Sequence, residues 1–257
     1  MSVKPAGHLN NSIVKAFTLL EYFSNVKTHW GVRELSREIG VHESTTYRLM
    51  STLESLGVLY KNPETEKYAL GLKLHELGNR VKVFDSVVSL SHPVLNEVAL
   101  EIEETVHLGI WHKGEVLMID KVECEKGLRL DSRIGQTSPP HCTGLGKILL
   151  AFDYIHKNEF LEASDRLVSF TPNTITHKDK LKEELEKIHR QQYALDNQEF
   201  ELGLICLAVP VFNNKGKLIA AISAAGPSVR FKKDQLKDYV EILKRGAEKL
   251  THKIGNL

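Results

Sequence analysis

Apolar residues recur every three or four positions in two short segments between residues 31 and 57, the spacing of amphipathic helices. The first predicted helix ends at Gly40, since glycine takes the left-handed conformation of a helix end without strain. The second begins near Glu43 and ends at Gly57. Their apolar residues are Val32, Leu35 and Ile39, then Leu49, Leu53 and Leu56. Two short helices joined by a tight turn predict a helix-turn-helix.

A β-hairpin is predicted directly after this pair. Val58–Lys61 and Glu66–Leu70 are separated by the turn residues Asn62–Thr65, which predicts a wing. Upstream, Ser12 is a candidate N-cap of a supporting helix that continues to Phe23. Its expected buried face consists of Ile13, Ala16, Phe17 and Leu20.

Beyond the hairpin, apolar residues step alternately by three and four positions, which predicts a linker helix over 73–92 packed against another helix. The partner is either a second copy of the chain or the interior of the same chain, and the pattern fits both. Pro93 suits the first turn of a further helix. The heptad-like residues are Leu74, Leu77, Val81, Phe84 and Val88.

From Thr105 onward the apolar period changes to the alternation typical of strands. Strands are predicted at Val106–Ile110, Val116–Ile119, Leu128–Ser132, Leu204–Phe212 and Lys217–Ala225. Helices are predicted at Gly144–Phe152, Lys178–Gln192 and Lys232–Lys253. Antiparallel strands punctuated by helices predict a mixed α/β (α+β) domain. We therefore expect a winged helix-turn-helix domain at 1–72, a linker helix at 73–92 and an effector-binding domain at 93–257.

The composition is that of an ordinary globular chain of 257 residues, with 42% hydrophobic and 26% charged residues. No apolar run approaches a membrane span and no signal-peptide core is present, so a cytoplasmic protein without a membrane partner is expected. Cys124, Cys142 and Cys206 are too widely spaced for a metal pair, and neither metal nor cofactor is expected. The net charge of +1 does not bear on nucleic-acid binding.

Small polar and basic side chains occupy the first turn of the second helix, where a major-groove recognition helix contacts base edges. Two amphipathic helices and a hairpin often form only a core, but helix, turn, helix and wing in this order favour DNA binding. Lys61 and Lys67 flank the wing turn and suit phosphate. The candidate DNA-binding residues are Arg33, His42, Glu43, Ser44, Thr45, Tyr47, Arg48, Lys61 and Lys67.

The same region resembles the DNA-binding domain of the IclR-type bacterial transcription regulators. The resemblance lies in Leu35–Gly40, Ser44–Leu49, Thr52–Gly57 and Tyr68–Gly71. That family often has Pro-Lys where this chain has His42-Glu43. The exchange lowers the expected phosphate affinity, and a carboxylate there can accept a hydrogen bond from a cytosine amino group.

The C-terminal part also resembles this family, so the resemblance covers nearly the whole chain. Its marks are Glu104–Val106, Pro140–Lys147, Thr174–Thr176, Gly203–Pro210 and Ala221–Arg230. The resemblance implies a GAF-like sensor domain for a small organic acid. The effector-binding residues that it implies are Leu130, Gly144, Leu145, Asp196, Leu204, Cys206 and Ser223.

The chemistry of these positions agrees with that implication. Gly144 and Leu145 open a predicted helix, where unpaired backbone amides bind anions. Asp196 can accept hydrogen bonds from ligand hydroxyls, although a solvated loop acid is the alternative. Ala225 stands where the family often has a second serine, and Leu145 is bulkier than the usual residue. We therefore expect a sugar acid or keto acid other than the simplest keto acids.

Enzymatic alternatives are weaker. His141 and Cys142 are adjacent, and adjacent side chains rarely meet as base and nucleophile. Gly146-Lys147 lacks the earlier glycine and the following Ser or Thr of a phosphate-binding loop. None of the 12 histidines pairs with a cysteine at zinc-finger spacing. An enzyme is therefore not expected.

The sequence predicts a transcription regulator controlled by a small carboxylate effector. We expect a repressor of a catabolic operon, acting as a homodimer or homotetramer on a near-palindromic operator in double-stranded DNA. The alternatives are an activator of such an operon, or a DNA-binding protein whose C-terminal domain senses nothing.

Overall fold

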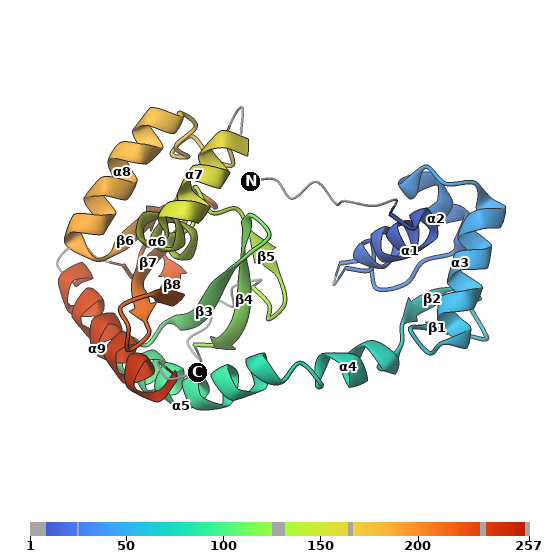
Figure 1. The fold of residues 1–257 in the computed structure, drawn as a ribbon, viewed down its shortest axis with the longest axis horizontal. Helices are drawn as coiled ribbons and strands as arrows, with labels where there is room; N and C mark the ends of the chain where they lie inside the picture. Colours follow the sequence, from blue (N-terminus) through green and yellow to red (C-terminus); the bar gives the residue numbers. More distant parts are fainter. Residues whose placement is uncertain (1–8, 25, 125–131, 164–166, 232–234, 255–257) are drawn as a thin grey trace. The chain divides into compact units, whose positions relative to one another are not determined.

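The computed structural model describes residues 9–24, 26–124, 132–163, 167–231 and 235–254. It consists of two compact units, Met1–Lys82 and Val83–Leu257. The first unit is mainly helical, and the second is built around a large sheet (Figure 1). Within the described residues, none of the helices has the length and apolar character needed to cross a membrane.

The first unit is the winged helix-turn-helix that the sequence predicts. Gly40 and Gly57 both adopt positive φ angles, 65° and 73°, and end the two helices as expected. Leu59 pairs with Leu70 in the antiparallel hairpin. Leu56 caps the recognition helix and is exposed, so its predicted place in the buried stripe was wrong. The elements are α1 Asn11–Glu21, α2 Val32–Ile39, α3 Glu43–Ser55, β1 Leu59–Lys61 and β2 Tyr68–Leu70.

The supporting helix α1 buries a different face from the one predicted. Asn10, not Ser12, is the N-cap, and its side chain accepts hydrogen bonds from the first-turn amides. Ile13 and Phe17 are 57% and 64% exposed, whereas Leu19 is fully buried. Because α1 carries apolar residues on more than one face, its periodicity does not identify the buried one. Packing against α2 and α3 decides it.

The predicted single linker helix is divided into two. α4 spans Leu72–Gly78, α5 spans Lys82–Ile102, and residues 79–81 between them are not α-helical. An apolar spacing of three and four residues does not reveal such a break, because both helices keep the same period. Pro93 lies inside α5 and not in a first turn. The prediction at Pro93 was wrong because α5 continues through the proline although the ring removes one N–H from the helical ladder.

The second unit contains a six-stranded antiparallel sheet in the order β5-β4-β3-β8-β7-β6. Its strands are β3 Thr105–His112, β4 Glu115–Val122, β5 Thr137–Ser138, β6 Ala194–Asn197, β7 Leu204–Phe212 and β8 Leu218–Pro227. Its further helices are α6 Gly144–Phe152, α7 Tyr154–Ala163, α8 Lys178–Gln191 and α9 Leu236–Ile254. The sequence did not predict β5, β6 or α7. The strand predicted at Leu128–Ser132 lies, except for Ser132, outside the described residues.

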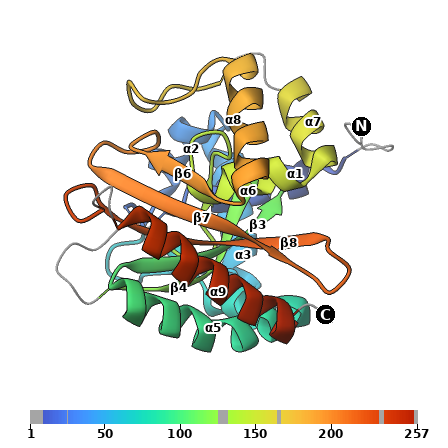
Figure 2. The same ribbon diagram turned by 90° about the vertical axis from the view of Figure 1, so that its left-hand side faces the viewer.

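Helices cover both faces of this sheet. α5 and α9 pack on one face, and α6 and α8 lie on the other (Figure 2). Val98, Leu207 and Leu243 are buried in the first layer, and Ile148 and Leu185 in the second. The unit is therefore the predicted α+β domain, and the N-terminus of α6 packs directly against the sheet.

Candidate effector pocket and nucleic-acid interface

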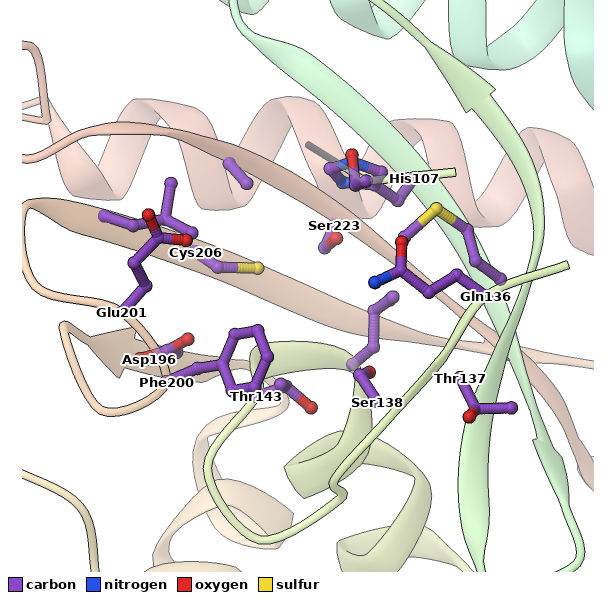
Figure 3. A pocket seen from close by; sticks show the side chains of 15 residues that line it. His107, Gln136, Thr137, Ser138, Thr143, Asp196, Phe200, Glu201, Cys206 and Ser223 are labelled. Atoms are coloured by element: carbon purple, nitrogen blue, oxygen red, sulfur yellow. The ribbon is translucent and has the colours of Figure 1, made fainter. Parts of the chain in front are cut away.

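A cavity of about 110 Å³ lies where α6 meets the sheet in the second unit. Strands β3, β8, β7 and β6 supply its wall, together with the start of α6 and the segment that contains β5. Figure 3 shows Asp196, Phe200 and Glu201 toward one end and His107 and Gln136 toward the other. The cavity therefore has two polar ends with different chemistry.

The strand register explains how these side chains meet. Asp196 on β6 is paired with Cys206 on β7, which is paired with Ala225 on β8. Two residues along β8, Ser223 is paired with His107 on β3. Side chains of paired residues lie on the same face of a sheet. Strands far apart in the sequence thus bring these side chains to the cavity on one face of the sheet.

The start of α6 can pack closely because Gly144 and Gly146 have no side chains. A Cβ on Gly144 would lie 2.9 Å from the Cys206 Sγ, and one on Gly146 would lie 2.3 Å from the Pro140 Cα. Thr143 is the N-cap: its hydroxyl accepts a hydrogen bond from the Gly146 amide and donates one to the Pro139 carbonyl. First-turn amides have no acceptor inside a helix. The Gly146 amide already donates to Thr143, so the amides of Gly144 and Leu145 are the ones at this helix start that are suited to an anion.

Asp196 is a buried acid and not the solvated loop residue of the alternative interpretation. Its side chain is 2% exposed, and Oδ1 accepts a hydrogen bond from the Glu199 amide at 2.7 Å. Burial raises the pKa of Asp196 to about 7. Behind it, the buried Lys147 ammonium pairs with Glu199 and donates to the Leu195 carbonyl at 2.6 Å. The Lys147 ammonium is thus paired with Glu199. The Asp196 carboxyl group can both donate and accept a hydrogen bond near neutral pH.

The opposite end contains Ser223, which is an expected effector residue, together with His107 and Gln136, which the sequence did not single out for the effector. His107 is buried, its Nε2 lies 2.9 Å from the Ser132 Oγ, and burial lowers its pKa to about 3, so the imidazole is neutral. The Ser223 hydroxyl is fully buried and has no hydrogen-bond partner among the described residues. Gln136 also lines this end, whereas Phe200 lines the Asp196 end (Figure 3). The alternation of residues 105–110 indicates that the His107 and Val106 side chains point to opposite faces of the sheet. It could not show which groups the His107 side chain contacts.

The expected effector residues are largely brought together. Leu145, Asp196, Leu204, Cys206 and Ser223 line the cavity. Gly144 packs against the Cys206 thiol and is not itself among the lining residues. Burial raises the pKa of that thiol to about 12. Leu130 lies outside the described residues.

The first turn of α3 presents the expected DNA-binding side chains. His42 is the N-cap and its Nδ1 lies 2.9 Å from the Ser44 Oγ. Glu43 accepts a hydrogen bond from the Arg33 Nε at 3.0 Å, and both side chains are largely exposed. Tyr47 and Arg48 are exposed and Thr45 is half-buried. Much of this set borders one groove between the starts of α2 and α3 and the wing: Arg33, His42, Glu43, Ser44, Tyr47, Lys61 and Lys67.

The two wing lysines differ. The Lys61 ammonium lies 3.0 Å from a Glu66 carboxylate oxygen, which raises the pKa of the lysine. Lys67 is exposed, and no acidic partner is found for it in the part of the chain that the structure describes. Lys67 is therefore the freer of the two for a phosphate.

The residues considered for catalysis do not form a nucleophile and base. Burial raises the pKa of the Cys142 thiol well above its usual range. The His141 Nε2 lies 2.9 Å from the Val168 carbonyl oxygen, to which it donates, and its pKa is lowered by burial. In the described residues no cluster of His, Cys, Asp and Glu is arranged to hold a metal.

Comparison with known proteins places these two sites in a family. Residues 12–63 match the IclR helix-turn-helix domain, and residues 81–252 match the bacterial transcriptional regulator IclR C-terminal domain. The chain belongs to the IclR family. It is 35% identical to the transcriptional regulator KdgR of Escherichia coli over 95% of this chain and 93% of that protein. It is 27% identical to the E. coli transcriptional repressor IclR over all of this chain and 94% of that protein.

Solved structures of the IclR family share the fold. The crystal structure of the Thermotoga maritima IclR matches with a TM-score of 0.75 and 33% identity, over 95% of this chain and 99% of that one. The chain is thus an IclR-type, DNA-binding transcription regulator, and its winged unit is the DNA-binding domain.

Proposed function

We propose that this IclR-family regulator represses a catabolic operon and that a small carboxylate effector controls its hold on the operator. The observation that carries the proposal is the cavity at the start of α6, which is lined by the buried side chains of Asp196 and Ser223. The name of the E. coli relative, a transcriptional repressor, supports the direction of control.

In this proposal the effector's carboxylate lies at the amides of Gly144 and Leu145, and its hydroxyls contact Asp196. Amides at a helix N-terminus stabilise an anion without a cationic side chain. A sugar acid or keto acid offers both kinds of group. A homodimer or homotetramer then places two recognition helices on a near-palindromic operator.

Control of DNA binding follows from differential affinity. An effector shifts the equilibrium between arrangements of the DNA-binding units only to the extent that it binds one arrangement more tightly than another. The residues that we assign to the effector and to DNA lie in different units. Loss of effector binding should therefore leave the intrinsic DNA affinity unchanged.

The test is a melting-temperature screen of the full-length protein against small carboxylates and their uncharged amides. A ligand that binds only the folded state raises the melting temperature with concentration. We expect carboxylates to stabilise the wild type and not Asp196→Ala, and the amides to have no effect. Stabilisation by uncharged compounds alone, or unchanged carboxylate binding by Asp196→Ala, would refute the proposal.

A further inference from the structure

Two buried threonines in the segment before α8 contact the turn after β6, although neither threonine lines the cavity. Thr171 and Thr174 are 6% and 8% exposed. The Thr171 hydroxyl donates a hydrogen bond to the Gln198 carbonyl oxygen at 2.7 Å. The Thr174 hydroxyl donates one to the Glu199 carbonyl oxygen at 2.6 Å. We call these two hydrogen bonds the threonine clamp.

The hydroxyls of the threonine clamp are themselves oriented by the backbone of their own segment. The amides of Phe170 and Thr171 donate to the Thr174 hydroxyl oxygen at 3.0 and 2.9 Å. The Asn173 amide donates to the Thr171 hydroxyl oxygen at 3.1 Å. A hydroxyl has a single proton to donate. Because amides already occupy the oxygens of both hydroxyls, each proton is directed at the turn after β6.

The turn that receives these hydrogen bonds contains a strained residue. Gln198 has a φ angle of 59°, in the left-handed region that residues other than glycine rarely adopt. Such a conformation costs free energy and persists only where surrounding contacts impose it. The Gln198 amide donates to the Leu204 carbonyl oxygen at 3.1 Å, and its side-chain oxygen accepts from the Gly203 amide at 2.9 Å. The turn is therefore held in one shape from both sides.

The shape of this turn sets the position of two side chains of the cavity. The Glu199 amide donates to the Asp196 Oδ1 at 2.7 Å, and the carbonyl of the same residue accepts from Thr174. The next residue, Phe200, lines the cavity, and its ring centroid lies 5.3 Å from that of Phe170. Asp196 and Phe200 thus depend on contacts made outside the cavity.

We propose that Thr171 and Thr174 are positioning residues of the effector pocket. Their hydroxyls fix the turn at 198–199, so that Asp196 and Phe200 meet the effector in one geometry. Neither threonine touches the effector. The inference rests on the proposed function for the role of the pocket, but the threonine clamp is tested on the protein without effector.

The state of the threonine clamp can be measured through the acid–base behaviour of Asp196. Burial raises the pKa of Asp196 to about 7, and the hydrogen bond from the Glu199 amide opposes that shift. Thr174→Val replaces the clamping hydroxyl by a methyl group, which frees the turn and loosens the amide from the carboxylate. The pKa of Asp196 then rises further. The other titratable groups around Asp196 are Lys147, Glu199, Glu201, Cys142 and Cys206.

The first experiment measures the unfolding free energy of the full-length, effector-free protein at several pH values by denaturant titration. A raised pKa in the folded state contributes stability that is lost as the pH rises through that pKa. For Thr174→Val we expect this loss to continue to a pH about one unit higher than in the wild type. A threonine with only a structural role would lower the stability equally at every pH, so parallel profiles would overturn the inference.

Three further variants complete this experiment. Thr174→Ser retains the hydroxyl and should restore the wild-type pH profile. Thr176→Val is the matched control, because no hydrogen bond of the Thr176 side chain is found in the described part of the chain. A profile shifted equally in Thr176→Val would contradict the assignment. If Thr174→Val does not fold, Thr171→Val provides the same comparison with Thr174 in place.

The second experiment tests the consequence for binding by titration calorimetry, with D-gluconate as the probe. We expect Thr174→Val to bind it at least about tenfold more weakly than the wild type, and Thr174→Ser and Thr176→Val to bind it equally well. Wild-type affinity in Thr174→Val would overturn the positioning role. If neither D-gluconate nor any other carboxylate binds the wild type, the proposed function fails, whereas the pH profiles still decide whether the threonine clamp positions Asp196.

Discussion

At the scale of single residues, the fold changes the acid–base chemistry of Asp196. Burial raises its pKa to about 7, with the Glu199 amide and Lys147 opposing the shift. An ordinary aspartate accepts hydrogen bonds only, whereas Asp196 can also donate one near neutral pH. That property suits the contact that we propose between Asp196 and the hydroxyls of the effector.

The raised pKa makes the stability of the effector-free protein depend on pH. The folded state holds the Asp196 proton more tightly than the unfolded state, so this contribution is present at low pH and is lost as pH rises toward the folded pKa. We expect the unfolding free energy of the wild type to fall between about pH 5 and about pH 8 more than that of Asp196→Asn, which cannot ionise. Denaturant titrations at several pH values measure this. Parallel profiles for the two proteins would show that Asp196 has an ordinary pKa.

Arg48 tests the face of α3 that meets DNA. Its side chain is exposed, and Met50 and Thr46 face the core instead. If Arg48 contacts a base, Arg48→Ala should weaken operator binding by roughly 1–3 kcal/mol without changing the melting temperature. Arg190→Ala, an exposed arginine of the second unit, is the control. Equal affinities for both variants at matched salt would mean that another face of α3 meets the DNA.

At the scale of elements, local signals decided which parts of the fold could be predicted. α2, α3, the wing, α6 and β7 follow from glycine stops, turn residues and clear periodicity. The strand β6 has four residues, too few for an alternation to be recognised, yet it holds Asp196. Its acid is buried through contacts with residues far away in the sequence, such as Lys147. Periodicity carries no information about such contacts, and for the same reason the partner of His107 could not be predicted.

The two lysines of the wing should differ in how much each contributes to the salt dependence of DNA affinity. Each phosphate contact contributes about one unit to the salt dependence of DNA affinity. Lys67→Ala should lower that slope by about one for every DNA sequence alike. Lys61→Ala should have the smaller effect, because its ammonium already pairs with Glu66. A loss restricted to a single operator sequence would show that Lys67 contacts a base.

The end of β8 is tied to the start of β3 by one ion pair. Arg230 donates two hydrogen bonds to Glu104, at 2.5 and 2.6 Å, and the Glu104 carboxylate is nearly fully buried. Arg230→Ala leaves that carboxylate unpaired and should cost about 3–5 kcal/mol of unfolding free energy. The matched control is Arg245→Ala, whose pair with Glu101 is half exposed and should contribute at most about 1 kcal/mol. Equal costs in denaturant titrations would show that the burial of Glu104 does not matter.

At the scale of the whole molecule, the two sites lie in separate compact units. No side chain that we assign to the effector is among those that we assign to DNA. In the proposed function, the effector acts by changing which arrangement of the units is populated, and the size of its effect is set by its differential affinity for those arrangements. Reciprocity then requires that operator DNA change the affinity for the effector by the same factor.

The most direct test is the affinity for operator DNA, isolated by selection from a random duplex pool, with and without the stabilising carboxylate. For the wild type we expect the carboxylate to weaken operator binding. For Asp196→Ala we expect wild-type affinity without the carboxylate and no change when it is added. A carboxylate that binds the wild type yet leaves operator affinity unchanged, or an Asp196→Ala protein that still responds, would contradict the account.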